Sequence, residues 1–226
     1  MITSAVNPRL KLVRRLESRR QRDKLGLFVC EGEDLVEAAR AAGVEPVDLL
    51  VAGESVEPDL LAAVSSLAHP PRVIGVFRRA DLAAYGPRPV GLALWHVGDP
   101  GNVGTLIRSA DAFGASVALS AGCADPTGSK ALRGSAGAIF RVPLGRFDEV
   151  TGRRVALVAR GGEPLAEAEL REGTVFVLGA EREGLPDDVV ASCDAVASIP
   201  LAAGAESLNV AAAGAIALYE LSRRGG

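Results

Sequence analysis

The sequence is poor in the two residue types that most often build metal centres and disulfide frameworks. Its 226 residues include three cysteines and two histidines. Cys30, Cys123 and Cys193 lie far apart and form no CxxC pair, and His69 and His96 are likewise separated. Zinc sites and disulfide scaffolds need several such residues at characteristic spacings. We therefore expect no metal and no disulfides, and we interpret the cysteines as small buried side chains in a reducing cytoplasm.

Long apolar segments are missing as well. No run approaches the ~18 consecutive apolar residues that a membrane-spanning helix needs. Residues 1–15 contain several basic side chains and lack the apolar core of an export signal. These absences predict a protein that works in the cytoplasm, without a membrane partner.

What the chain does contain is the composition of a folded globular protein, with 48% hydrophobic and 23% charged residues. The net charge of −3 is unevenly distributed, because residues 9–24 hold eight basic side chains and two acidic ones. Asn7 as N-cap and Pro8 at the first helical position predict that this block is a helix. A folded basic helix suits a structured nucleic acid, although a solvated helix face has a similar composition.

The order of the predicted elements divides the chain into two α/β domains. Short apolar strands and helices alternate through the first third, and a break rich in glycine and proline follows at residues 84–91. We expect a small domain at residues 1–88, which carries the basic helix, and a second domain at residues 89–226. The length allows each of them a hydrophobic core.

Three segments of the second domain run from a strand through a glycine-bearing loop into a helix. In the first, LALWHV leads into DPGNVG, and Asn102 is the predicted N-cap of a helix that carries Arg108. Such loops collect ligands in open α/β sheets because backbone N–H groups are unpaired there. The segment matches neither the dinucleotide fingerprint nor the phosphate-binding loop with its lysine. Arg108 either reaches back to the loop or extends into water.

The second segment joins the apolar run VFVLG to the loop AEREGLP. Gly179 ends the strand, and Glu181 either helps to cap the helix near Pro186 or holds an arginine or a ligand group at the sheet edge. Upstream, Lys130 and Arg133 stand among small residues in SKALRGS. Their side chains either bind phosphate or solvate a short helix.

The third segment reads AVASIPLAAGA and then ESLNVAAAGAIALYEL. We predict Ser207 as the N-cap of the last helix and Asn209 inside its first turn, where the amide faces a ligand held by the loop. The run Ala-Ala-Ala-Gly permits close approach of another backbone. Taken alone, this segment is also typical of an ordinary capped C-terminal helix.

Taken together and in this order, the three segments resemble the signature motifs of a known family. DPGNVGTLIRSADAFGA, VFVLGAEREGLP and IPLAAGAESLNVAAAGAIALYE resemble the three motifs of the SpoU family, also called TrmH-like RNA 2′-O-ribose methyltransferases. KALRGSAGAIFRVP resembles the family's segment between the first two motifs. The opening of the chain resembles the substrate-binding domain that many ribosomal-RNA members carry at the N-terminus.

The resemblance implies a fold, a cofactor and a partner. It implies an α/β domain with a deep C-terminal trefoil knot, S-adenosylmethionine bound in a bent form, and a homodimer whose two subunits build the site. Gly179, Ile199 and Leu208 would contact the cofactor largely through their backbone. Five polar residues would form the catalytic pocket, namely Asn102, Arg108, Glu181, Ser207 and Asn209.

The chemistry expected of this pocket is an in-line displacement, in which alignment of the reacting atoms is the main task. The ribose hydroxyl also has to lose its proton. Family mechanisms assign the base to the arginine that matches Arg108, yet a free guanidinium holds its proton to above ~12. Two hypotheses therefore stand: Arg108 is the base, or it positions the ribose or phosphate while the proton leaves elsewhere.

The sequence thus predicts an enzyme that methylates a ribose 2′-hydroxyl in RNA, with ribosomal RNA favoured by the extra N-terminal domain. A transfer-RNA methyltransferase and a non-catalytic RNA-binding protein on the same fold are the alternatives. The complete set of polar motif residues argues against a decayed site. The basic residues expected to contact RNA are Arg14, Arg15, Arg19, Arg20, Lys130 and Arg133.

Overall fold

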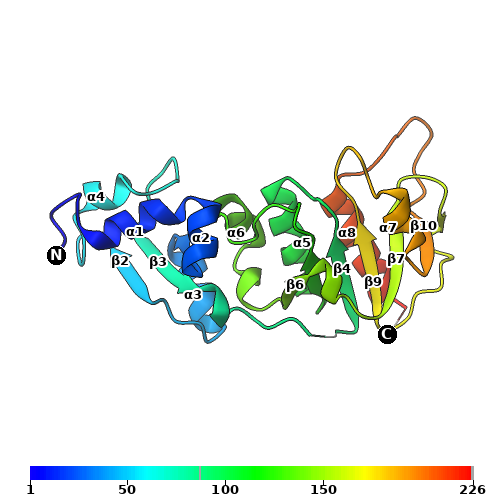
Figure 1. Cartoon of the computed structure of the whole chain (residues 1–226), viewed down its shortest axis with the longest axis horizontal. Coiled ribbons are helices and arrows are strands. Elements are labelled where there is room, and N and C mark those ends of the chain that lie inside the picture. The colour runs from blue at the N-terminus through cyan, green and yellow to red at the C-terminus, as the bar shows by residue number, and fades with distance from the viewer. Residues whose placement is uncertain (87, 225–226) are drawn as a thin grey trace.

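Two β-sheets of different kinds organise the chain (Figure 1). The computed structural model describes residues 1–86 and 88–224, so Pro87 of the predicted linker lies outside the described residues. The smaller sheet has the antiparallel order β1-β3-β2, and the larger has seven parallel strands in the order β6-β5-β4-β9-β7-β10-β8. The predicted α/β class is therefore confirmed.

The smaller sheet carries the N-terminal helices. Its strands are β1 (Leu27–Glu31), β2 (Asp48–Val51) and β3 (Val73–Arg78). Its helices are α1 (Pro8–Leu16), α2 (Arg19–Leu25), α3 (Glu33–Ala41) and α4 (Pro58–Ala62), and the 3-10 turn η1 (Arg79–Asp81) follows β3. The apolar side of α1, formed by Leu10, Val13 and Leu16, is buried beside Leu50 and Ile74 of the sheet.

The basic block at the start of the chain forms two helices where one was predicted. Asn7 is the N-cap of α1, as predicted, and its side chain accepts a hydrogen bond of 2.9 Å from the backbone N–H of Arg9. The helix ends because Ser18 adopts an extended backbone, with φ −83° and ψ 126°, and α2 begins directly after it. A serine in this conformation is typical of a helix start. The block therefore presents its charges from two separate helices.

The larger sheet carries the three predicted strand–loop–helix segments, whose strands are β4, β9 and β10. Its strands are β4 (Val90–Leu94), β5 (Ser116–Leu119), β6 (Leu144–Arg146), β7 (Arg153–Val158), β8 (Glu163–Pro164), β9 (Thr174–Leu178) and β10 (Ala195–Ser198). The helices are α5 (Pro100–Ala112), α6 (Ser129–Ser135), α7 (Asp187–Ala191) and α8 (Val210–Ser222), with the 3-10 turns η2 (Ala138–Phe140) and η3 (Phe147–Glu149).

Small residues let the helices of the larger unit pack closely. A Cβ added to Gly214 of α8 would lie 2.4 Å from a methyl carbon of Leu106 on α5. A Cβ added to Gly104 of α5 would lie 2.3 Å from the carbonyl oxygen of Ala131 on α6. The contact of Gly104 with the backbone of α6 requires glycine, whereas a larger residue at position 214 would force the Leu106 side chain to move. The atoms nearest to Gly214 belong to the side chains of Leu106 and Leu178, so the approach of another backbone to the Ala-Ala-Ala-Gly run stays a prediction.

The two parts of the chain share a core and a buried ion pair. The predicted boundary at residues 88 and 89 lies between β3 and β4, but Phe140 of the larger unit packs against Phe77 of the smaller one, with ring centroids 5.4 Å apart. Arg22 of α2 bonds Asp125 at 2.8 Å, and their side chains are only 9% and 7% exposed. Arg79 reaches the same carboxylate at 2.9 Å. These contacts hold the smaller unit against the larger one.

Two further sequence-based predictions were wrong. The pattern PDLLAAVSSLA predicts a helix over residues 58–68, but α4 ends at Ala62. The segment ADLAAYG predicts a short helix, but only the turn η1 forms there. The edge strands β6 and β8 were not predicted, because two or three residues carry no recognisable periodicity. Among the helices that the structure describes, none has both the length and the apolar character required to cross a bilayer.

Candidate functional site

The three predicted loops converge at the carboxyl ends of the parallel strands. The first follows β4, the second follows β9 and the third follows β10. Because β4 and β9 are neighbours in the sheet, the first two loops meet although about 80 residues separate them. The third loop leads into α8, which packs against α5.

Glu181, Asn102 and Asn209 form one hydrogen-bonded network across these loops. The Nδ2 of Asn102 donates to a carboxylate oxygen of Glu181 at 2.9 Å, and the Nδ2 of Asn209 donates to Oδ1 of Asn102 at 3.0 Å. The backbone N–H groups of Gly98 and Asp99 also point to the Glu181 carboxylate, at 3.4 and 3.3 Å. The side chain of Asn102 therefore bridges the second and third loops.

The donors around Glu181 favour its ionised form. Partial burial tends to raise the pKa of Glu181, but the hydrogen bonds from Asn102 and from the loop backbone outweigh it and leave the pKa below its ordinary value. Glu181 is thus a carboxylate near neutral pH. It serves as the common acceptor that holds the first loop to the second.

Both helix starts differ from the prediction by a few residues. The N-cap of α5 is Asp99, whose carboxylate accepts from the backbone N–H of Asn102 at 3.0 Å. The N-cap of α8 is Asn209, whose Oδ1 accepts from Ala211 and Ala212. Asn102 and Ser207 are therefore not caps, and Asn209 precedes the first turn. Asp before Pro at the first helical position is a recognisable helix start, so Asp99 was a missed signal.

Asp99 also binds a basic residue that was predicted to contact RNA. The Nζ of Lys130 lies 2.7 Å from Oδ2 of Asp99. This ammonium group, together with the N–H of Asn102, lowers the pKa of Asp99. Lys130 therefore joins α6 to the start of α5.

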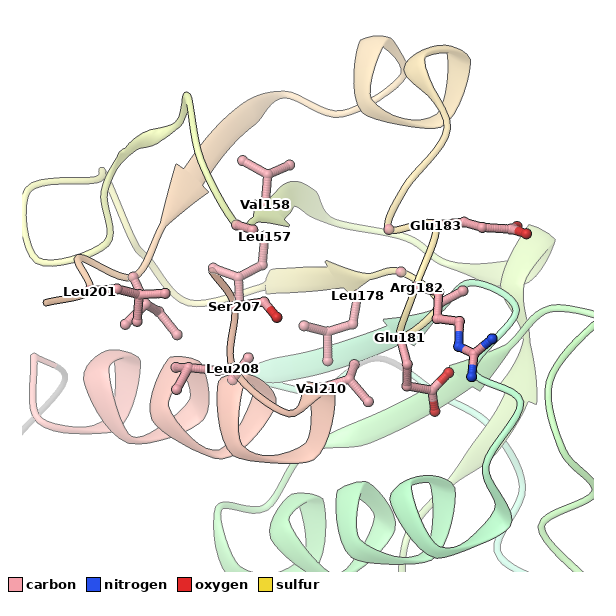
Figure 2. A pocket seen from close by; sticks show the side chains of 16 residues that line it. Leu157, Val158, Leu178, Glu181, Arg182, Glu183, Leu201, Ser207, Leu208 and Val210 are labelled. Carbon is pink, nitrogen blue, oxygen red and sulfur yellow. The ribbon is translucent and has the colours of Figure 1, made fainter. Parts of the chain in front are cut away.

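A pocket of about 320 Å³ opens beside the network (Figure 2). It is lined by the ends of β7 and β9, the loop after β9, and the chain that leads into α8. The three residues predicted to contact the cofactor, Gly179, Ile199 and Leu208, all lie in its wall, together with Ser207 and Glu181. Figure 2 shows Leu178, Leu208 and Val210 around its apolar part, while the Glu181 carboxylate points toward α5.

The loop after β9 folds tightly over the strand end because Gly179 has no side chain. A Cβ at this position would lie 2.2 Å from the carbonyl carbon of Gly184. Ala180 and Gly184 exchange two backbone hydrogen bonds, of 3.1 and 2.9 Å, and Gly184 has a φ of +67°. Both glycines are therefore required for this turn. The turn fixes the direction of Glu181 and shapes one wall of the pocket.

Arg108 stands apart from the network. It lies six residues after Asn102 on α5, which is about 240° around an ideal helix. Its side chain is exposed, and among the residues that the structure describes it makes neither an ion pair nor a hydrogen bond. The Arg108 side chain therefore forms no bond of either kind with the loop after β4. Arg108 instead occupies the exposed face of α5, one turn after Thr105.

The residues predicted to contact RNA are exposed, but other arginines of the basic block at residues 9–24 form ion pairs within the fold. Arg14, Arg15, Arg19 and Arg20 all lie on the surface of α1 and α2, and Arg133 is exposed on α6. Two other members of the block are engaged within the fold. Arg9 pairs with Asp48, and Arg22 is the buried partner of Asp125.

Comparison with known proteins identifies relatives of both parts of the chain. Residues 89–219 match the SpoU rRNA Methylase family, and residues 7–79 match the MRM3-like substrate binding domain. The chain is 32% identical over 244 residues to the 23S rRNA (guanosine(2553)-2′-O)-methyltransferase RlmP of Bacillus subtilis, covering 97% of this chain and 98% of that protein. It is also 32% identical to an uncharacterized tRNA/rRNA methyltransferase of Synechocystis, over 99% of this chain and 93% of the relative.

Solved structures resemble the whole chain as well. An AdoMet-bound rRNA methyltransferase from Sinorhizobium meliloti superposes with a TM-score of 0.88 and 28% identity, covering 99% of this chain and 97% of that one. The SpoU methyltransferase AviRb from Streptomyces viridochromogenes, in complex with the cofactor AdoMet, superposes with a TM-score of 0.86 and 27% identity. The coverage there is 97% of this chain and 98% of the other.

Proposed function

The chain belongs to the SpoU rRNA Methylase family, and we propose that it methylates a ribose 2′-hydroxyl of ribosomal RNA at the site described above. It is an RNA methyltransferase that uses S-adenosylmethionine. The observation that carries the assignment of the site is the Glu181–Asn102–Asn209 network beside the pocket lined by Gly179 and Leu208.

The pocket suits S-adenosylmethionine in size and in lining. Its volume of about 320 Å³ lies within the range of small-molecule sites, and apolar side chains from Leu178, Ile199 and Leu208 would enclose the flat base. The missing side chain of Gly179 makes room for the backbone of Gly184, and the turn so formed lines the pocket. When bound, the cofactor supplies an electrophilic methyl group on a sulfonium.

The polar residues of the chain would align the RNA with that methyl group. Asn102, held between Glu181 and Asn209, cannot rotate without breaking two hydrogen bonds. The network therefore keeps the first and third loops at a fixed separation, which is the main requirement of an in-line displacement. Ser207, in the pocket wall, is placed to hydrogen-bond the cofactor or the ribose. Glu181 holds the arrangement together as its ionised centre.

Arg108 would act from the edge of the site on the ribose or a phosphate. A guanidinium is a strong bidentate ligand for phosphate and does not give up its proton in proteins. Its position on the exposed face of α5 supports this positioning role better than the role of base. The proton of the ribose hydroxyl would then leave to water or to another acceptor.

A homodimer and the C-terminal trefoil knot belong to the same proposal. Ala212, Ile216 and Tyr219 form an apolar stripe on the exposed side of α8, and Tyr219 is 59% exposed. Such a stripe favours burial against a second copy of the chain. The strand order β4-β9-β7-β10 departs from chain order and is compatible with a knotted path. We place this work in the cytoplasm, where bacterial ribosomes are made.

The test is to map ribose methylation by mass spectrometry on ribosomal RNA and transfer RNA incubated with the protein and S-adenosylmethionine. We expect a single 2′-O-methyl group in ribosomal RNA and none with the Asn102→Ala variant. If only transfer RNA is methylated, the substrate is transfer RNA and not ribosomal RNA. Base methylation, or no RNA methylation, would overturn the function. Calorimetry with S-adenosylmethionine distinguishes the enzyme from a non-catalytic RNA-binding protein, because the latter would not bind the cofactor.

A further inference from the structure

A second groove lies on the other side of the loop that follows β4. It has a volume of about 570 Å³ and is not used by the site described above. Its walls come from the carboxyl ends of β4, β5 and β6 and from α2 of the smaller unit. Trp95, His96 and Phe147 supply aromatic rings, and Arg19 and Arg146 supply positive charge.

The aromatic wall of this groove is held in a fixed arrangement. The rings of Trp95 and His96 are parallel within 2°, with centroids 4.8 Å apart, and Phe147 meets Trp95 edge-on at 5.0 Å. Adjacent residues can stack in this way because His96 has a φ of +53°, in the left-handed region. The backbone N–H of His96 donates to Oγ of Ser120 at 2.9 Å.

Gly122 gives the imidazole ring the room it needs. A Cβ at Gly122 would lie 2.5 Å from the ring of His96. Positive φ is uncommon for non-glycine residues, and histidine is among the few residue types that adopt it more readily. The absence of a side chain at Gly122 therefore lets the His96 ring lie close to the loop, and the ring stays stacked on Trp95 while His96 remains exposed at the groove.

The groove opens onto the basic helix α2. Nη1 of Arg19 donates to the carbonyl oxygen of Cys123 at 3.0 Å, which anchors the guanidinium at the rim while about half of it stays exposed. Arg20 lies next to it on the surface of α2, and Arg15 lies just before the break between α1 and α2. Arg146 pairs with Asp148, and Arg19 has Asp23 at 3.9 Å, so among the described residues the positive charge without an ion pair lies on Arg15 and Arg20 beside the groove. The α2 side suits a phosphate backbone.

The groove and the catalytic network share one short loop. Trp95 and His96 begin it, whereas Gly98 and Asp99 donate their N–H groups to Glu181. The three steps from His96 to Asp99 span at most about 10 Å. A nucleotide in the groove would therefore lie near the one whose ribose is methylated.

We propose that this groove binds one unpaired base of the RNA substrate against the wall of Trp95, His96 and Phe147, with its flanking phosphates on Arg19 and the surface of α2. The inference rests on the proposed function, since it adds a second contact for the same RNA. Unpaired bases are commonly bound by aromatic surfaces, and such stacking accepts any base. The site thus selects for an exposed base rather than for a sequence.

The chain offers a direct probe, because Trp95 is its single tryptophan. Intrinsic fluorescence is measured while the protein is titrated with a short oligouridylate, and separately with an abasic ribose-phosphate strand of the same length. We expect the oligouridylate to quench the emission in a saturable way and the abasic strand to leave it nearly unchanged. Equal quenching by both strands, or quenching by neither, would overturn the proposal.

Two variants and their matched controls locate the contact. His96→Asn keeps a residue that tolerates positive φ but removes the ring, so the affinity for oligouridylate should fall about 5- to 100-fold. His69→Asn changes the other histidine, which is exposed outside the groove, and should have no effect. Arg19→Gln should reduce the slope of log affinity against log salt by about 1. Arg40→Gln, at an exposed arginine of α3, should not reduce it.

The same protein preparations are assayed for ribose methylation of ribosomal RNA. If the wild type methylates RNA while the oligouridylate leaves Trp95 unquenched, the groove proposal is wrong and the proposed function stands. If base-dependent quenching occurs without any methylation, the groove proposal stands and the proposed function is wrong.

Discussion

Asn102 and Asn209 are 107 positions apart in the sequence, yet the Nδ2 of Asn209 donates a hydrogen bond to the Oδ1 of Asn102 at 3.0 Å. Each residue also has a second function. Asn102 donates to Glu181, and Asn209 caps α8. Each amide uses both its oxygen and its nitrogen, so no isosteric residue preserves all of these contacts. A substitution at Asn209 can therefore separate the two functions of this residue.

Asn209→Asp separates capping from the network. An aspartate still accepts from the N–H groups of Ala211 and Ala212, so the free energy of unfolding should change by less than about 0.5 kcal/mol. It cannot donate to Asn102, and kcat should fall about tenfold. Asn209→Ala loses both functions and should also cost about 1 kcal/mol of stability. Thermal unfolding and methyl-transfer kinetics measure the two effects; unchanged kcat in Asn209→Asp would exclude a role for the bond.

Gly179→Ala tests the tight turn beside the cofactor pocket. The added Cβ would lie 2.2 Å from the backbone of Gly184, so the loop has to move. We expect the Kd for S-adenosylmethionine, measured by calorimetry, to rise about 10- to 100-fold. Gly86→Ala is the matched control, since a Cβ there meets no atom within 4 Å. Equal affinity in both variants would show that the turn does not shape the binding site.

Arg108→Lys distinguishes positioning from proton abstraction. A lysine keeps the positive charge but loses the bidentate geometry, so KM for RNA should rise about tenfold. If Arg108 only positions the RNA, the pH dependence of kcat should match that of the wild type. A pH–rate profile that moves with the substitution would instead support Arg108 as the base.

Asp125→Asn should loosen the contact between the two parts of the chain. It leaves the buried guanidinium of Arg22 without its carboxylate partner, which typically costs about 3–5 kcal/mol. The midpoint of thermal unfolding should therefore fall by about 10 °C. Glu54→Gln is the control, because its ion pair with Arg72 is exposed and contributes at most about 1 kcal/mol. Equal midpoints for the two variants would contradict the structural role of Asp125.

The same residue predicts a dependence on pH. Burial tends to raise the pKa of Asp125, but hydrogen bonds from Thr127 and the charges of Arg79 and Arg22 outweigh it, so the folded-state pKa is lowered. The stabilisation is therefore fully present above the unfolded-state pKa of about 3.9 and is lost as the pH falls through the lower folded-state value. The difference between wild type and Asp125→Asn should be constant above about pH 5 and shrink below about pH 4.

Tyr219→Glu tests the proposed homodimer. A charge placed in the apolar stripe of α8 should prevent its burial against a second copy, and sedimentation should then report a monomer. Val6→Glu introduces the same charge at another exposed apolar residue, which lies outside α8, and should leave the dimer intact. A monomeric wild type would show that the stripe serves some other purpose.

Local patterns in the sequence were sufficient for most elements but not for their ends. The start of α1 was predicted from Asn7 and Pro8, and the strands β4, β9 and β10 were predicted from apolar runs. The caps of α5 and α8 were misassigned, because two favoured cap residues lie close together at each start, Asp99 and Asn102 at α5 and Ser207 and Asn209 at α8. The groove residues Trp95 and His96 gave no signal, since stacking of neighbours depends on the φ of a single residue.

The sequence by itself determined the α/β class, the basic block at the start of the chain and the three polar glycine loops, because each depends on residues close together in the chain. Only the tertiary structure decided which polar residues meet. The order of the parallel strands sets β9 beside β4, so Glu181 reaches Asn102, and the packing of α8 on α5 brings Asn209 to the same amide. Arg108 lies on an exposed face of α5, because its separation of six residues from Asn102 along the helix places the two side chains on different sides of the helix.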